Sequence, residues 1–285
     1  MENNAIEEVI GKEYKCLDKG FVRLVDVMGD DNSIVQAARV SYGKGTKTYN
    51  EDRSLIRYLM RHSHTSPFEM VELKFHIKLP IFVARQWIRH RTANVNEYSG
   101  RYSEMRDEFY LPEASEIRSQ SSENKQGRSD NELSQLVINQ ILQKMQNSQK
   151  ASYSDYIYYL ENDLARELAR INLPLSTYTE WYWKIDLHNL FHFLKLRMDT
   201  HAQYEIRVYA NTIADILKQI LPISYEAFED YELSAIRFSK NELDVLADII
   251  NKEKLKNIQA SDYGFNKSEW KELEEKFNKF IKNKD

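Results

Sequence analysis

The chain has 285 residues and a formal net charge of −4, with 42% hydrophobic residues, 29% charged residues and a single cysteine. A chain of this length buries most of its apolar surface in one large domain or two small ones, and this composition excludes disorder of the whole chain. The lone Cys16 excludes a disulfide framework, a cysteine-rich zinc module and an iron–sulfur cluster. The near-neutral charge gives no reason to expect nucleic-acid binding through bulk electrostatics.

The N-terminus lacks a basic start followed by an apolar run, so it does not resemble a signal peptide. No stretch approaches the roughly 18 consecutive apolar residues that a membrane span requires. We therefore expect a soluble, cytoplasmic protein that has no membrane partner.

The first predicted elements are a strand over residues 21–27 and a helix that begins after the polar residues 30–32. A second helix follows, with Asn50 as its cap. The clearest strand covers Val71–Leu79, because five apolar residues alternate there with polar ones. Pro80 then suits the first turn of a helix that we expect to cover residues 81–90.

The second half of the chain is predicted to be mostly helical. Residues 113–150 are polar and predict a mobile surface insertion that leads into a helix around residues 133–141. The remaining predicted elements are a long helix at 152–171, an aromatic strand at 178–183, helices at 187–198 and 202–219, and two helices after residue 235, where Ser239 with Glu242 and Asn266 with Glu269 match capping boxes.

Cationic side chains are concentrated in residues 85–101, which read RQWIRHRTANVNEYSGR. On a helix through residue 90, Gln86, Arg89 and His90 would share one face. In an extended segment, Glu97, Ser99 and Arg101 would point the same way. Guanidinium groups at this density suit the capture of phosphate, and a solvated basic helix face is the weaker interpretation.

A second concentration lies at residues 186–205, where His188 and His192 stand one helical turn apart. A shared zinc ion is one interpretation, but the segment has no HExxH pattern, so we expect no metal. Contact with a polar ligand and plain packing remain open for these histidines. Arg166 and Arg170 also stand one turn apart, and on spacing alone an ordinary ion-pairing helix face is favoured.

These residues match a known family. The segment RHRTANVNEYSGR (89–101) resembles the RHRxxSxNExSxR signature of the flavin-dependent thymidylate synthases, with Asn94 where serine is usual. The segments HTSPFE (64–69), KFHIKLPIFVARQW (74–87), ARINLPLSTYTEWYW (169–183) and LKLRMDTHAQYEI (194–206) are similar to family segments in the same order. The resemblance covers residues 35–110 and 155–230.

The resemblance implies an α+β fold with a twisted, mainly antiparallel sheet flanked by helices. It places a catalytic domain at residues 1–235, which includes the insertion, and leaves 236–285 as a helical C-terminal extension. It implies reductive methylation of dUMP to dTMP with 5,10-methylenetetrahydrofolate as carbon donor, FAD as redox cofactor and NADPH as reductant. It further implies a homotetramer with shared active sites and no cysteine nucleophile, which is consistent with Cys16 lying outside every matching segment.

The resemblance also implies the site residues. Those expected to bind dUMP are Gln86, Arg89, Glu97, Ser99, Gly100, Arg101, Arg170 and Arg197. Those expected to bind FAD are Ser41, His64, Arg89, His90, Arg91, Glu97, Asp186, His188 and His192.

Arg197 is the implied catalytic residue: it would face the uracil ring, favour ionisation of N3 and so activate C5. Ser99 has no evident base, so we expect it to contact the ligand rather than act as a nucleophile. The family commonly has an Asn-x-Arg pattern and a later Asn where this chain has Asp186, His188 and His192, so these FAD contacts depart from the usual pattern.

Two alternatives from other classes remain at this stage. The first is a nucleotide- or nucleic-acid-binding module that uses the 85–101 cluster, with Tyr98 and Tyr102 as stacking residues. The second is a histidine-dependent metallohydrolase. For the leading interpretation we expect small-molecule partners, dUMP and folate, and no nucleic acid.

Overall fold

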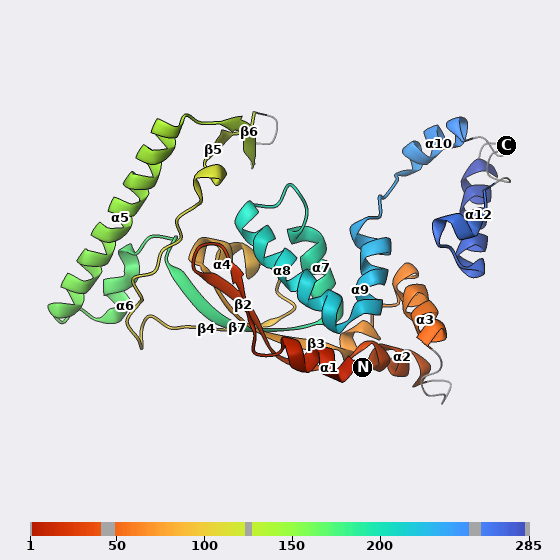
Figure 1. Ribbon diagram of the computed structural model, residues 1–285, viewed down its shortest axis with the longest axis horizontal. Helices are drawn as coiled ribbons and strands as arrows, with labels where there is room; N and C mark the ends of the chain where they lie inside the picture. The colour runs from red at the N-terminus through yellow and green to blue at the C-terminus, as the bar shows by residue number, and fades with distance from the viewer. Residues whose placement is uncertain (1, 41–48, 123–126, 251–257, 283–285) are drawn as a thin grey trace. The chain divides into compact units, whose positions relative to one another are not determined.

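A computed structural model of the chain describes residues 2–40, 49–122, 127–250 and 258–282 (Figure 1). The chain divides into two compact units, Met1–Leu233 and Ser234–Asp285. The first unit contains the sheet and every site residue that the sequence predicts. The fold is of the α+β class with an antiparallel sheet, which confirms the expected fold class.

The strands are β1 (Glu13–Cys16), β2 (Gly20–Met28), β3 (Glu72–Pro80), β4 (Asn94–Glu97), β5 (Arg118–Gln120), β6 (Arg128–Glu132) and β7 (Tyr178–Asp186). The α-helices are α1 (Glu2–Val9), α2 (Asp31–Arg39), α3 (Tyr49–Arg61), α4 (Ile81–Trp87), α5 (Gln135–Glu161), α6 (Arg166–Ala169), α7 (Leu187–Arg197), α8 (Tyr204–Ile220), α9 (Pro222–Phe228), α10 (Lys240–Ile249) and α12 (Lys267–Lys282). Short 3₁₀ segments are η2 (Phe68–Met70), η3 (Ala114–Glu116), η4 (Arg170–Asn172) and η6 (Ala260–Tyr263), and a π-helical turn is η5 (Glu229–Leu233).

The main sheet of the described residues has the strand order β1-β2-β3-β7-β4, and each neighbouring pair is antiparallel. In the β3–β7 register, Phe75 lies opposite Trp183 and Ile77 opposite Trp181. All four side chains are buried, because alternation along each strand directs them to the same face. The alternating pattern that predicts β3 from the sequence is thus confirmed.

Helices α4, α7 and α8 pack against this face, as Figure 1 shows. Trp87 at the end of α4 is fully buried. Its ring centroid lies 5.7 Å from that of Trp181, 4.6 Å from that of Phe193 and 5.9 Å from that of Tyr209. This aromatic cluster joins the sheet to all three helices, so it fixes the end of α4 relative to the end of α7.

The helix predicted over residues 81–90 is shorter than expected. Helix α4 ends at Trp87, and the next residues continue as turns in which the His90 N–H donates to the Trp87 carbonyl. Gln86, Arg89 and His90 therefore do not share one helical face. The reason is tertiary: strand β4 begins at Asn94 and pairs with β7, so the chain must leave the helix axis within a few residues.

The polar segment 113–150 also differs from its prediction. It contains a β5–β6 hairpin, and α5 runs without a break from Gln135 to Glu161, in place of two helices divided near residue 150. No Gly or Pro interrupts these residues. Ser134 caps the helix, and the Gln135 side chain donates to Asn139 one turn later at 2.9 Å. The helix predicted to reach residue 171 is replaced by the end of α5, then α6 and η4.

The other predicted elements lie close to their expected places. Asp30 caps α2, and α3 begins at Tyr49, so Asn50 lies inside that helix rather than before it. Helices α1 and α9 have no counterpart in the sequence prediction. In the second unit, Ser239 forms a capping box with Glu242 at the start of α10, and Asn266 exchanges hydrogen bonds with Glu269 at the start of α12. Across the described residues no helix is long and apolar enough to cross a membrane.

Candidate active site

Arg197, at the C-terminal end of α7, contacts two other predicted site residues. Its Nε donates to His90 Nε2 at 2.9 Å, and its Nη2 donates to the Gln86 carbonyl oxygen at 3.3 Å. Gln86 belongs to the last turn of α4, and His90 follows that helix. We call Gln86, His90 and Arg197 the Arg197 group. The structure thus brings together two residues expected to bind dUMP, Gln86 and Arg197, and one expected to bind FAD, His90.

The protonation state of His90 follows from its surroundings. Burial, the Arg197 charge and then the neighbouring His192 lower the pKa of His90 to about 4. At neutral pH the ring is therefore uncharged, its Nε2 accepts from Arg197, and the proton resides on Nδ1. Burial also lowers the pKa of Arg197, although a guanidinium remains charged in proteins. The group thus presents one positive charge rather than two.

A second group forms where β4 ends. The Tyr98 N–H still pairs with the Glu180 carbonyl at 2.8 Å, but the Tyr102 and Ser103 N–H groups then both donate to the Ser99 carbonyl. The chain therefore turns at Ser99, and the prediction that residues 97, 99 and 101 point the same way along an extended segment is wrong. We call residues 97–101 the Gly100 loop.

Gly100 is buried, and a side chain there would displace its neighbours. A Cβ there would lie 2.6 Å from Met105 Sδ and 3.2 Å from Arg170 Cδ. The stem of Arg170 thus packs directly against the Gly100 loop. Glu97, at the start of the loop, accepts a hydrogen bond from Thr179 Oγ1 at 2.8 Å.

The arginines that the sequence places at the site differ from most others in how their charge is balanced. Elsewhere in the first unit, arginines such as Arg39, Arg57 and Arg106 form ion pairs with carboxylates. Within the described ranges, no ion pair involves the predicted site arginines: Arg89, Arg91, Arg101, Arg170 and Arg197. Several guanidinium groups without carboxylate partners are what an anionic ligand needs.

The remaining predicted residues are placed as follows. His64 is exposed beside Tyr58, with ring centroids 5.8 Å apart, and Ser41 lies outside the described residues. Asp186 caps α7 and accepts from the backbone N–H and the side-chain amide of Asn189 at 2.9 and 2.7 Å. His192 is exposed with its ring 5.9 Å from that of His90, and His188 is half-buried on the same helix. In the part of the chain that the structure describes, no group of three or more potential ligands is arranged to hold a metal ion.

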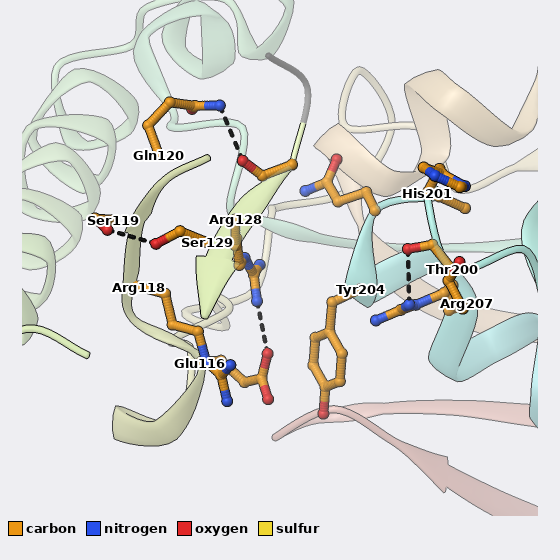
Figure 2. Close-up of a pocket in the computed structure, with 13 residues that line it drawn as sticks. Glu116, Arg118, Ser119, Gln120, Arg128, Ser129, Thr200, His201, Tyr204 and Arg207 are labelled. Atoms are coloured by element: carbon orange, nitrogen blue, oxygen red, sulfur yellow. Dashed lines mark hydrogen bonds and ion pairs between the residues drawn. The ribbon is translucent and has the colours of Figure 1, made fainter. Parts of the chain in front are cut away.

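A pocket of about 620 Å³ adjoins the Arg197 group, between the β5–β6 hairpin and the turn that joins α7 to α8 (Figure 2). Its cations are largely engaged: Arg128 pairs with Glu116 at 2.7 Å and with the buried Glu205, and Arg207 donates to the Thr200 carbonyl at 3.0 Å. Its lining residues are Glu116, Arg118, Ser119, Gln120, Gly127, Arg128, Ser129, Thr200, His201, Ala202, Gln203, Tyr204 and Arg207.

Sequence reasoning overlooked the connection between this pocket and the Arg197 group. Gln86 Nε2 donates to Gln203 Oε1, so a pocket residue touches a predicted dUMP residue. Gln203 lies in the matching segment 194–206, which is the one signal that could have drawn attention to it. Arg128 lies in the polar insertion, and nothing in that composition distinguishes it from a surface arginine.

Comparison with known proteins identifies the class to which this fold and site belong. The sequence model of the family described as "Thymidylate synthase complementing protein" (Thy1) matches residues 23–223. The chain is 55% identical over 268 residues to a flavin-dependent thymidylate synthase of Ehrlichia ruminantium (strain Gardel), which covers 94% of this chain and 89% of that protein. It is 58% identical over 239 residues to the enzyme of the same name from Treponema denticola, which covers 84% of this chain and 90% of that one.

A solved structure is similar as well. The UMP/dUMP methylase PolB from Streptomyces cacaoi, bound with 5-Br dUMP, superposes with a TM-score of 0.69 at 31% identity, over 77% of this chain and 99% of that one. The chain therefore belongs to the Thy1 family, the flavin-dependent thymidylate synthases. It is an enzyme that methylates dUMP to dTMP and depends on a flavin, which confirms the function and the cofactor expected from the sequence.

Proposed function

We propose that each active site of this thymidylate synthase is built from more than one copy of the chain, within a homotetramer. One copy would contribute the Arg197 group, and another would contribute the Gly100 loop with Arg170. Hydrogen bonds join the members of the Arg197 group, and packing joins Gly100 to Arg170. No hydrogen bond or ion pair connects the two groups within the described part of one chain, which supports a site completed by a second copy.

In this proposal the phosphate of dUMP binds at the Gly100 loop. Arg101 and Arg170 would provide its positive charges, since neither forms an ion pair with a carboxylate of the described chain. Ser99 would contact the ligand without acting as a nucleophile. The full proposed set for dUMP is Gln86, Arg89, Glu97, Ser99, Gly100, Arg101, Arg170 and Arg197.

Arg197 would act on the uracil ring. A half-buried cation that is already fixed by His90 and by the Gln86 carbonyl needs little reorganisation when negative charge develops beside it. It would favour ionisation of N3 and so make C5 nucleophilic toward the methylene group of 5,10-methylenetetrahydrofolate. Neutral His90 orients the guanidinium through its hydrogen bond and adds no second positive charge beside it. A preorganised cation of this kind lowers the activation barrier by about 3 kcal/mol.

The residues present also fit a flavin dinucleotide. Arg89 and Arg91 are exposed cations that could hold its phosphates, and His90 and His192 provide ring donors nearby. When bound, FAD carries reducing electrons from NADPH to the nucleotide. Asp186 would serve this site through the cap of α7, because both of its carboxylate oxygens already accept from Asn189. The full proposed set is Ser41, His64, Arg89, His90, Arg91, Glu97, Asp186, His188 and His192.

The single observation that carries the proposal is the separation of unpaired arginines into two groups. It is tested by mixing two inactive variants, Arg197→Ala and Arg170→Ala, each on its own chain. If every site takes one group from each of two chains, random assembly gives intact sites with a probability of about one quarter. Tritium release from [5-³H]dUMP should then recover to about that fraction of wild-type activity.

The control is either variant mixed with itself, which should remain inactive while it retains bound flavin. If the mixed sample shows no recovery although both chains co-assemble, the two groups act within one chain and the shared-site proposal is wrong. Size-exclusion chromatography with light scattering on the wild-type protein measures the assembly directly, and a monomer that is fully active would contradict the proposal.

A further inference from the structure

The carboxylate of Glu205 is buried, with only 2% of the residue exposed, at the first turn of α8. A carboxylate removed from water must be matched by donors. Tyr110 donates its hydroxyl to Oε1 at 3.1 Å, and Arg128 of the β5–β6 hairpin pairs with the same oxygen. Gln203 Nε2 donates to Oε2 at 2.8 Å. Among the described residues, all three of these partners donate to Glu205.

This arrangement fixes the direction of a longer chain of hydrogen bonds. An ionised carboxylate can only accept, so Gln203 must turn its amide nitrogen toward Glu205 and its carbonyl oxygen away. That oxygen accepts from Gln86 Nε2. Gln86 is in turn left with Oε1 as its remaining side-chain acceptor, and no residue in the described ranges donates to that oxygen. The orientation of Gln86 is thus set two side chains away.

We propose that Glu205 is a positioning residue for nucleotide binding. Through Gln203 it holds the Gln86 amide so that its oxygen accepts a hydrogen bond from the nucleotide, and Arg128 of the β5–β6 hairpin holds Glu205. The proposal rests on the function proposed above, in which Gln86 contacts dUMP. It gives the hairpin a role at the site, because Arg128 of β6 forms an ion pair with Glu205. Arg128 also pairs with Glu116, which lines the adjoining pocket (Figure 2).

The decisive variant is Glu205→Gln, which keeps the shape of the side chain. Arg128 and Tyr110 still need the remaining carbonyl oxygen, so the new amide nitrogen faces Gln203. The side-chain amides of Gln203 and Gln86 then both flip, exchanging their oxygen and nitrogen positions. Gln86 therefore presents an N–H donor to the nucleotide, which also offers a donor there. We expect the KM for dUMP to rise about tenfold or more with a smaller change in kcat, and flavin binding to be retained.

The matched control is Tyr110→Phe, which removes a buried hydrogen bond from the same carboxylate but leaves the chain direction unchanged. We expect its KM for dUMP to stay within about twofold of wild type. If Tyr110→Phe and Glu205→Gln raise KM equally, Glu205 has only a structural role and the proposal is wrong. Should Glu205→Gln fail to fold, Gln203→Met interrupts the chain at a half-buried position, and an unchanged KM in that variant also overturns the proposal.

Two nucleotide groups could supply the donor, the imide N3–H and the 3′-hydroxyl. Binding of dUMP is therefore compared with that of its 3-methyl and 3′-deoxy analogues. The analogue that lacks the contacted donor should bind wild type more weakly than dUMP does, and should bind Glu205→Gln as well as dUMP does. Equal discrimination by both proteins would contradict the proposal. If wild type binds no dUMP at all, the proposed function fails instead.

Discussion

Arg197 and His90 form the pair on which the chemistry of this site depends. The guanidinium is half-buried and has no carboxylate to neutralise it within the described chain, so its field remains available to a ligand. His90 can accept from it only while its ring is neutral, which burial and the Arg197 charge maintain. The Arg197 charge therefore helps to keep His90 neutral, and neutral His90 in turn holds the Arg197 guanidinium by a hydrogen bond.

This coupling predicts a pH dependence. The folded pKa of His90 is about 4, against 6.5 for an unperturbed histidine. Between these values the unfolded chain binds more protons than the folded one, so the contribution of His90 lowers the free energy of unfolding as pH falls from 6.5 toward 4. Urea denaturation across that window should show this slope, and His90→Gln should reduce it. An identical slope in wild type and variant would contradict the assignment.

The thiol of Cys16 gives a second prediction at this scale. Burial raises the pKa of Cys16 to about 12, and its Sγ lies 3.3 Å from Thr212 Oγ1. A thiol in this state does not form a nucleophile at neutral pH. We expect Cys16→Ala to retain wild-type turnover of dUMP and to lose about 1 kcal/mol of stability through the small cavity. Loss of turnover by a folded Cys16→Ala protein would show that the thiol takes part in the reaction.

At the scale of elements, the N-terminus of α7 depends on Asp186. Asparagine caps helices as well as aspartate does, and its oxygen can still accept from the Asn189 N–H. Asp186→Asn should therefore leave the melting temperature nearly unchanged and add a donor beside the proposed flavin site, so flavin should bind at least as tightly. Asp186→Ala should lower the free energy of unfolding by about 1 kcal/mol. Equal destabilisation by both variants would show that the carboxylate charge, and not the capping oxygen, stabilises α7.

Elements with strong local patterns could be predicted from the sequence, and those set by distant contacts could not. The alternation in β3 and the capping boxes of α10 and α12 are local signals, and the structure confirms them. The end of α4 is set by the pairing of β4 with β7, which no local window contains. The sequence predicts two helices where α5 is continuous, because its polar residues resemble a loop, although no Gly or Pro in it breaks a helix.

The same distinction applies to the candidate site. The motif at 89–101 and the segment around Arg197 could be found because charge is concentrated in them. The Arg128–Glu205–Gln203 connection could not, because its members come from β6, α8 and the turn before α8, and each is unremarkable alone. Only the packing of the hairpin against α8 brings them to one carboxylate.

At the scale of the whole molecule, the site and the C-terminal unit can be separated experimentally. All predicted site residues lie within Met1–Leu233, and the Thy1 match ends at residue 223. The Streptomyces cacaoi methylase is matched over 99% of its length by 77% of this chain. We expect a chain that ends after Leu233 to fold, bind flavin and release tritium from [5-³H]dUMP at a rate near wild type. A folded but inactive truncation would assign the C-terminal unit a part in catalysis.

The place of β4 in the sheet has a consequence for how the enzyme is made. Strand β4 has β7 as its neighbour in the sheet, and β7 begins at Tyr178, long after β4 has left the ribosome. The β1–β2 hairpin can form early because its pairing is local, whereas pairing between β4 and β7 must wait for synthesis to continue. The arginine-rich segment of the nascent chain therefore cannot take its place in the sheet until β7 emerges, and we expect competence to bind nucleotide to be acquired late in folding.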